Sequence, residues 1–185
     1  MRIISGKYKG KKLYLPKDNL TRPLKDLTKE SLFNIISHSS LFNFKLDNTI
    51  ILDLFSGIGT FGLECLSRNA KKVYFIENHI NAISILKKNI GLLEMEKRSS
   101  ILKNNLYDAE ILKNIKKEFD IIFIDPPYKD KKISILINLI LKNNLLKTDG
   151  IIIIHRHKKD IERFPNNFKI LREEIYGLSK IIFGK

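Results

Sequence analysis

The sequence has little cysteine and no long apolar run. Cys65 is the only cysteine among 185 residues, which excludes a disulfide framework and favours a reducing, cytoplasmic location. No apolar stretch approaches the roughly 20 residues of a membrane-spanning helix, and the first residues lack the apolar core of a signal peptide. We expect the Cys65 thiol to pack inertly in the interior, because no histidine lies near it in sequence.

The sequence is also short of acidic residues. There are 20 of them against 34 lysines and arginines, which gives a net charge of +14. A surface of this sign favours a polyanion as partner. Residues 1–30 carry nine basic and three acidic residues, hence +6. A general bias toward lysine would not concentrate charge at one end. The predicted contacts to a nucleic acid are Lys7, Lys9, Lys11, Lys12 and Arg22.

Hydrophobic periodicity predicts an α/β fold with a mostly parallel sheet. Apolar runs predict strands near 49–54, 72–76, 99–103, 119–124 and 149–154. Helices are expected between them, near 60–69, 79–92, 107–117 and 131–142. This alternation is typical of a doubly wound sheet, in which ligands bind at the carboxyl ends of the strands.

Different patterns occupy the two ends of the chain. A β-hairpin is predicted over 2–15, followed by a helix over 25–38. At the other end, 168–176 and 178–183 flank Gly177 and predict a hairpin that adds antiparallel strands. The predicted sheet therefore has seven strands.

A glycine-rich turn follows the first predicted strand. Gly57-Ile58-Gly59-Thr60-Phe61-Gly62 matches the pattern Gly-x-Gly-x-x-Gly. Glycines let the backbone approach a ligand closely, and the next helix offers free N–H groups. Glu77 ends the next strand, where a carboxylate can accept both hydroxyls of a ribose. Asp53 would repel a pyrophosphate but suits the amino group of a methionine, which favours S-adenosylmethionine over NAD.

Other residues near this turn have alternative interpretations. Phe55 lies in the turn and is counted with the cofactor residues, and Asn105 is placed to bond an adenine. Asn104 competes with Asn105 for that role. Asp53 could instead cap a helix, and Glu77 could be a solvated strand end.

The tetrapeptide Asp125-Pro126-Pro127-Tyr128 follows another predicted strand. Asp125 can accept one N–H of an exocyclic amine, and a carbonyl of the diproline segment can accept the other. Both prolines have a fixed φ and no N–H, so competing donors are absent. Tyr128 can stack on a planar base. Asp-Pro also starts ordinary turns, but the preceding strand and the following aromatic favour an amine-binding loop.

Several segments, taken in order, resemble one family. They are Arg2-Ile3-Ile4-Ser5-Gly6, Lys9-Gly10-Lys11-Lys12-Leu13, Arg22-Pro23, Glu30-Ser31-Leu32-Phe33-Asn34, Leu52-Asp53-Leu54-Phe55-Ser56-Gly57, Gly62-Leu63-Glu64, Leu66-Ser67-Arg68 and Asp125-Pro126-Pro127-Tyr128. Together they resemble the RsmD family, bacterial methyltransferases of guanine-N2 in small-subunit ribosomal RNA. The last motif is shared with adenine-N6 DNA methyltransferases, whereas the N-terminal segments are more specific.

The resemblance implies a class I, Rossmann-like methyltransferase. Its N-terminal basic hairpin and helix would span 1–45 and its catalytic domain 46–185. S-adenosylmethionine would be the methyl donor. The substrate would be 16S rRNA in an assembled or assembling small subunit. The enzyme would be a monomer that contains no metal. The implied cofactor residues are Asp53, Gly57, Gly59, Glu77 and Asn105, and the implied catalytic residues are Asp125, Pro126, Pro127 and Tyr128.

The sequence departs from the family at two places. Leu27 and Lys29 stand where arginines are usual, which weakens the prediction of an arginine cluster on that helix. His155-Arg156 follows the fifth predicted strand, where an acid is common. His155 and His157 lack a third ligand at a suitable spacing for a metal. A DNA adenine-N6 methyltransferase and a noncatalytic ribosome-binding factor are the alternative functions.

Overall fold

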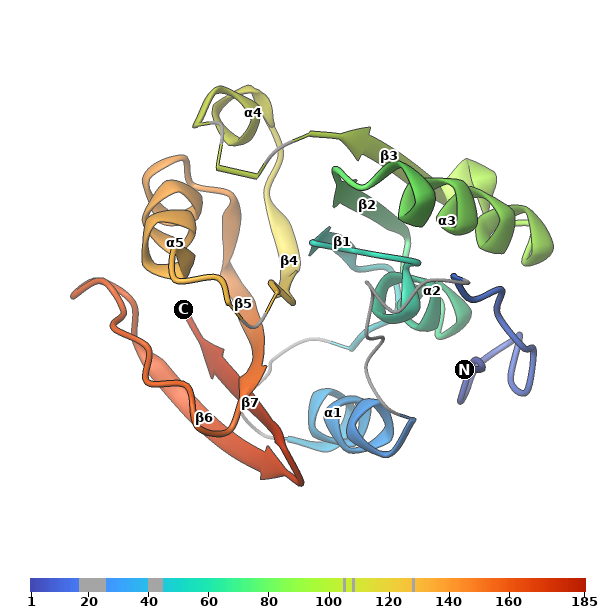
Figure 1. The fold of residues 1–185 in the computed structure, drawn as a ribbon, viewed down its shortest axis with the longest axis horizontal. Helices are drawn as coiled ribbons and strands as arrows, with labels where there is room; N and C mark the ends of the chain where they lie inside the picture. Colours follow the sequence, from blue (N-terminus) through green and yellow to red (C-terminus); the bar gives the residue numbers. More distant parts are fainter. Residues whose placement is uncertain (17–25, 40–44, 105, 108, 128) are drawn as a thin grey trace.

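A seven-stranded sheet forms the centre of the computed structural model, which describes the chain except residues 17–25, 40–44, 105, 108 and 128. The strand order is β3-β2-β1-β4-β5-β7-β6 (Figure 1). The first five strands in this order are parallel, and β7 is antiparallel to both β5 and β6. The predicted α/β fold with a mostly parallel, seven-stranded sheet is therefore confirmed.

The strands and helices follow the predicted alternation closely. The strands are β1 Ile50–Leu54, β2 Lys72–Glu77, β3 Ser99–Lys103, β4 Phe119–Ile124, β5 Leu146–His157, β6 Ile170–Tyr176 and β7 Ser179–Gly184. The helices are α1 Asp26–His38, α2 Thr60–Ser67, α3 Ile80–Leu92, the 3-10 turn Glu96–Arg98, α4 Ala109–Asn114 and α5 Ile133–Lys142. No helix in the described ranges is long and apolar enough to cross a membrane.

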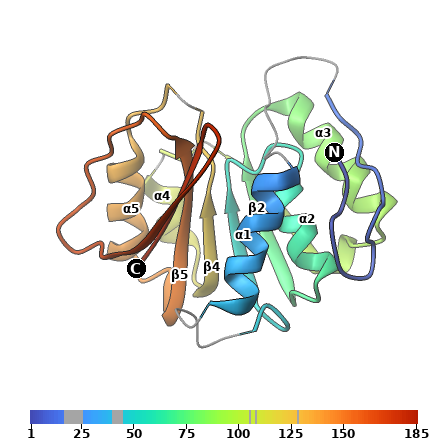
Figure 2. The ribbon, with the colours of Figure 1, turned by 90° about the horizontal axis from the view of Figure 1, so that it is seen from below.

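Two hydrophobic clusters cover the two faces of the sheet. Successive strand residues point to opposite faces, so Ile121 belongs to one cluster and Ile122 to the other. Side chains of α1, α2 and α3 complete the first cluster, and those of α4 and α5 complete the second. The helices lie on the two sides of the sheet accordingly (Figures 1 and 2). Burial on both faces explains why the central strands are almost continuously apolar.

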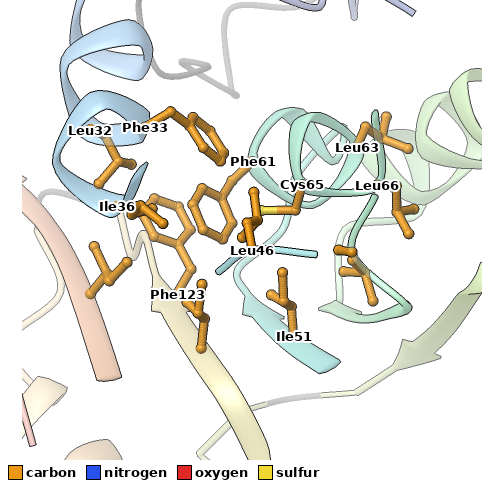
Figure 3. Close-up of a cluster of buried hydrophobic side chains, with 14 of the residues drawn as sticks. Leu32, Phe33, Ile36, Leu46, Ile51, Phe61, Leu63, Cys65, Leu66 and Phe123 are labelled. Atoms are coloured by element: carbon orange, nitrogen blue, oxygen red, sulfur yellow. The ribbon is translucent and has the colours of Figure 1, made fainter. Parts of the chain in front are cut away.

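Helix α1 is held in the first cluster by a stack of three aromatic rings. The Phe33 ring lies 5.4 Å from that of Phe61 on α2, which lies 4.0 Å from that of Phe123 on β4. Figure 3 shows this stack with Leu32 and Ile36 beside it. Cys65 is fully buried in the same cluster, and burial raises the pKa of its thiol. The predicted inert role of this cysteine agrees with its surroundings.

Residues 1–16, called here the N-terminal arm, do not form the predicted hairpin of two strands. The chain reverses direction, but the described residues contain only one antiparallel bridge there, between Arg2 and Lys12. The N–H groups of Ile4 and Ser5 instead donate to the carboxylate of Glu64 on α2, at 2.7 and 2.9 Å. Backbone bonds still cross the arm, from the Ile3 N–H to the Lys11 carbonyl and from the Leu13 N–H to the Met1 carbonyl, so the chain reversal resembles a hairpin without two regular strands.

A buried ion pair lies beneath the arm. Glu64 and Lys29 are both 0% exposed, and their charged atoms are 3.7 Å apart. Lys29 also donates to the Arg2 carbonyl at 2.7 Å, and Glu64 accepts from Arg68 Nε at 2.9 Å. Burial lowers the pKa of the Lys29 ammonium, and Glu64 opposes this shift. Lys29 is thus part of the scaffold, and it cannot reach a nucleic acid from this position.

Candidate active site at the carboxyl edge of the sheet

Three adjacent strands bring the predicted site residues to one edge. β1 is paired with β2 on one side and β4 on the other, with Leu54 opposite both Ile76 and Ile124. The next residues along these strands are Phe55, Glu77 and Asp125, so they lie at the same level. The strand order reverses between β1 and β4, which is the switch point where such sheets bind ligands.

The glycine-rich turn has an unusual backbone. Phe55, Gly57 and Gly59 have φ values of 57°, 54° and 83°. A bulky residue such as Phe55 is rarely found at positive φ, and such strain is concentrated at functional sites. A Cβ on Gly57 would meet no atom within 4 Å, whereas one on Gly59 would lie 2.4 Å from Leu86 Cδ1. Gly57 therefore borders open space, and Gly59 permits close packing against α3.

Asp53 holds the start of helix α2. It is 1% exposed, and its Oδ2 accepts the Gly62 N–H at 3.0 Å. This contact is the helix-capping role that the sequence left open for Asp53. Burial raises the pKa of Asp53 well above its usual range, and the nearby Asp125 and Glu77 raise it further. The three carboxylates thus act on one another electrostatically within a protein of net charge +14.

Glu77 is fixed by three backbone N–H groups. Its Oε2 accepts from Gly57 at 2.8 Å, and its Oε1 accepts from Asn78 and His79 at 2.9 Å each. These bonds lock the carboxylate against the glycine-rich turn, so Glu77 is not a loosely solvated strand end. Next to it, His79 Nδ1 is buried and has no hydrogen-bond partner within the described residues.

Asp125 is paired with a histidine that the sequence did not connect with it. Asp125 Oδ1 lies 2.8 Å from His155 Nδ1, and His155 Nε2 lies 2.9 Å from Ser179 Oγ. The predicted strand ended at 154, but β5 continues to His157, so His155 and Arg156 lie inside the strand. The register of β4 against β5 was the signal that could have revealed this pair, because Ile124 pairs with Ile154 and Asp125 therefore lies next to His155.

Arg156 supports the loop that follows Asp125. Arg156 is 2% exposed, and its guanidinium donates to the carbonyls of Pro127 at 3.3 Å and Asp130 at 2.8 Å. The Asp130 N–H also donates to the Pro127 carbonyl, at 2.8 Å. The Pro126 carbonyl has no such donor in the described ranges. Of the two proline carbonyls, Pro126 is therefore the better acceptor for a ligand.

Tyr107 links the turn after β1 to the loop after β4. Its hydroxyl donates to Asp130, and its ring lies 6.0 Å from that of Phe55. Burial and the hydrogen bond to Asp130 raise the pKa of the phenol. Tyr107 therefore stays a neutral donor and ties together two loops that border the site.

The N-terminal arm is connected to the glycine-rich turn through one buried amide. The Asn89 side chain on α3 accepts the Tyr14 N–H at 2.8 Å and donates to the Tyr14 carbonyl at 3.2 Å. It also donates to the Ile58 carbonyl at 3.2 Å. Since Ile58 lies in the glycine-rich turn, Asn89 joins the arm to that turn directly.

Several predicted residues lie elsewhere or outside the described residues. Tyr128, Asn105 and Arg22 belong to the ranges that the structure does not describe. The predicted arm lysines are exposed, and none forms an ion pair in the described part of the chain. They are Lys7, Lys9, Lys11 and Lys12.

Known proteins match this chain along its whole length. The family model described as Conserved hypothetical protein 95 matches residues 1–185. Ribosomal RNA small subunit methyltransferase D of Haemophilus influenzae is 31% identical over 179 residues, which cover 96% of this chain and 90% of that protein. The YlbH protein of Bacillus subtilis is 35% identical over 188 residues, which cover 100% of this chain and 98% of that protein.

A solved structure agrees with the sequence matches. The Escherichia coli protein yhhF has a TM-score of 0.83 and 26% identity, with coverage of 100% of this chain and 96% of that one. The similarity therefore includes the arm, the sheet and the C-terminal strands. The chain belongs to the family of ribosomal RNA small subunit methyltransferase D, which is the family that its sequence motifs resemble.

Proposed function

We propose that the protein transfers a methyl group from S-adenosylmethionine to the exocyclic N2 of one guanine in 16S rRNA. The main support for this proposal is that Asp53, Glu77 and Asp125 come together at the carboxyl edge of the sheet in a strongly basic protein. The Glu77 and Asp125 carboxylates suit a cationic donor, while the basic surface suits a polyanionic substrate. The names of the relatives support rRNA as the substrate. We further propose that the enzyme is a cytoplasmic monomer.

The residues at the turn fit S-adenosylmethionine. Glu77 is pre-oriented beside Gly57, where its remaining lone pairs suit the ribose hydroxyls. The open space at Gly57 admits a ligand close to the backbone. Asp53 caps helix α2 behind the turn, and Phe55 and Asn105 are the proposed neighbours of the adenosine. When bound, S-adenosylmethionine supplies a methyl group made electrophilic by its sulfonium.

The loop after β4 is proposed to orient the guanine amine. Asp125 accepts one N–H, the Pro126 carbonyl accepts the other, and Tyr128 stacks on the base. Pro127 keeps the loop rigid through its fixed φ and its bonds to Arg156 and Asp130. The amine lone pair is thereby directed at the methyl carbon, and orientation of this kind lowers a barrier without a metal.

The chemistry then requires only one proton acceptor. The N2 lone pair forms the new bond to carbon while the bond from carbon to sulfur breaks, and its electron pair stays on sulfur. The surplus proton on N2 passes to Asp125 or to water. The base must be unpaired or flipped out before this step, as enzymes that act on bases require.

Methyl transfer to different acceptors tests the function. Labelled S-adenosylmethionine is supplied with naked 16S rRNA, small ribosomal subunits, duplex DNA and protein in parallel, and the labelled nucleoside is identified. We expect N2-methylguanine in rRNA. N6-methyladenine would instead establish the DNA methyltransferase alternative, and no transfer to any acceptor would support a noncatalytic binding factor.

Replacing Glu77 with alanine tests the donor site. Loss of hydrogen bonds to a charged group costs about 1.5 to 3 kcal/mol, so the Kd for S-adenosylmethionine should rise about 10- to 150-fold. Calorimetry measures this change. Glu118→Ala, at an exposed position before β4, is the matched control. Tight binding of NAD to the wild type would contradict the assignment of the donor.

Replacing Lys7, Lys9, Lys11 and Lys12 with glutamine tests the RNA-binding role of the arm within the proposed division into 1–45 and 46–185. Each lost phosphate contact lowers the slope of log K against log salt by about 0.7 to 0.9, so four should lower it by about 3. Binding to rRNA or small subunits should weaken while cofactor affinity stays constant. Filter binding over a salt series provides the measurement.

A second set of lysines provides the control for this charge change. Exposed lysines at the amino edge of the sheet lie away from the proposed site, and their replacement removes the same charge; they are Lys116, Lys117, Lys142 and Lys169. The salt slope of this variant should change less. If both variants behave alike, the arm is an ordinary solvated surface and RNA binds elsewhere.

A further inference from the structure

His155 occupies a buried position directly behind Asp125. It is 4% exposed and lies in β5, whose neighbours are β4 and β7. One ring nitrogen lies 2.8 Å from Asp125 Oδ1 and the other 2.9 Å from Ser179 Oγ. A histidine that only filled space in the core would need no such pair of polar partners. Its ring joins the C-terminal hairpin to the proposed amine-binding loop.

The partners determine which ring nitrogen carries the hydrogen. A neutral imidazole has one donor and one acceptor, and an ionised carboxylate can only accept. In a neutral ring Nδ1 therefore donates to the Asp125 carboxylate, and Nε2 accepts from the Ser179 hydroxyl. The Asp125 carboxylate thus selects the tautomer in which the N–H points at it, and the Ser179 hydroxyl, which can donate or accept, holds the other side of the ring.

We propose that His155 is a positioning residue for Asp125 and that Ser179 holds the His155 ring in place. This inference rests on the proposed function. The Asp125 side chain is 24% exposed and lies just past the end of β4, where a carboxylate held by one bond only can rotate. With Oδ1 engaged by His155, rotation of the carboxylate is restricted. Its other oxygen is then aimed at the substrate amine, and small errors in such an aim reduce turnover strongly.

Two amide variants separate positioning from packing. His155→Asn places an amide N–H near the position of Nδ1, whereas His155→Gln places it near that of Nε2, away from Asp125. We expect His155→Asn to keep kcat within a few-fold of wild type and His155→Gln to lose about 10- to 100-fold. KM for the RNA and Kd for S-adenosylmethionine should change little in either. Ser179→Ala should lower kcat by a smaller factor.

The kinetic results can overturn the inference in two ways. Equal kcat values in His155→Asn and His155→Gln would show that the place of the donor is irrelevant. A fall confined to KM or to cofactor affinity would show a general structural role. Thermal melting of each variant shows whether it folds. If a His155 variant does not fold, Ser179→Ala takes its place as the test, and an unchanged kcat in Ser179→Ala would overturn the inference.

An independent measurement does not use activity. Nitrogen NMR of the His155 ring in the wild-type protein should show the hydrogen on Nδ1, and Asp125→Ala, which removes the carboxylate acceptor, should increase the share of the other tautomer. A hydrogen on Nε2 in the wild type would overturn the inference. Failure of the wild type to methylate any nucleic acid would instead sink the proposed function, while the NMR result would still decide the Asp125–His155 geometry.

Discussion

Asp125→Ala is expected to reduce methyl transfer by at least about 10- to 150-fold while cofactor affinity stays nearly unchanged. The variant loses the acceptor that orients the amine, and a charge-assisted hydrogen bond of this kind contributes about 1.5 to 3 kcal/mol. The loss is larger if the bond forms fully only in the transition state. Single-turnover transfer of labelled methyl measures the rate, and calorimetry measures the affinity for S-adenosylmethionine.

The control for Asp125 is an acid of the same kind away from the site. Asp149 is exposed in β5 near the opposite edge of the sheet, and Asp149→Ala should leave both quantities unchanged. Near-normal turnover in Asp125→Ala would remove Asp125 from the mechanism. It would also remove the basis for a positioning role of His155.

Glu64→Ala is expected to destabilise the protein by about 3 to 5 kcal/mol, because it leaves the buried Lys29 ammonium without its carboxylate. The variant also strips the acceptor from the N–H groups of Ile4 and Ser5 and from Arg68. For a chain of this size, each kcal/mol shifts Tm by about 2 to 4 °C. Urea unfolding and thermal melting measure the effect.

An exposed glutamate provides the comparison for this stability change. Glu173 lies in the edge strand β6, and Glu173→Ala should remain within about 0.5 kcal/mol of wild type. A loss of less than about 1 kcal/mol in Glu64→Ala would contradict the view that the arm is anchored through this carboxylate. In that case Asp26, whose Oδ1 lies 4.0 Å from Lys29 Nζ, is enough to hold the ammonium, or Lys29 loses its charge.

The strands could be predicted because burial on both faces leaves a plain signal. β4 reads Phe-Asp-Ile-Ile-Phe-Ile and is almost entirely apolar. The anchoring of the arm could not be predicted, because it depends on Glu64, 60 residues from Ile4. Local pattern contains no information about a helix carboxylate that accepts hydrogen bonds from a distant segment.

The site was predictable to the extent that it sits at strand ends. Glu77 and Asp125 follow apolar runs, so their meeting at one edge follows from a parallel sheet. Their partners were hidden, because they depend on register and strand length. His155 reaches Asp125 only because β5 continues past residue 154 beside β4. The sequence alone ended that strand too early and left His155 and Arg156 without a role.

Asn89 couples the position of the arm to that of the glycine-rich turn. Any displacement of Tyr14 must either break its two hydrogen bonds to Asn89 or be transmitted to Ile58. A ligand on the arm and a ligand at the turn therefore act on the same amide group. By thermodynamic reciprocity, whatever factor RNA imposes on the affinity for the methyl donor, the donor imposes on the affinity for RNA.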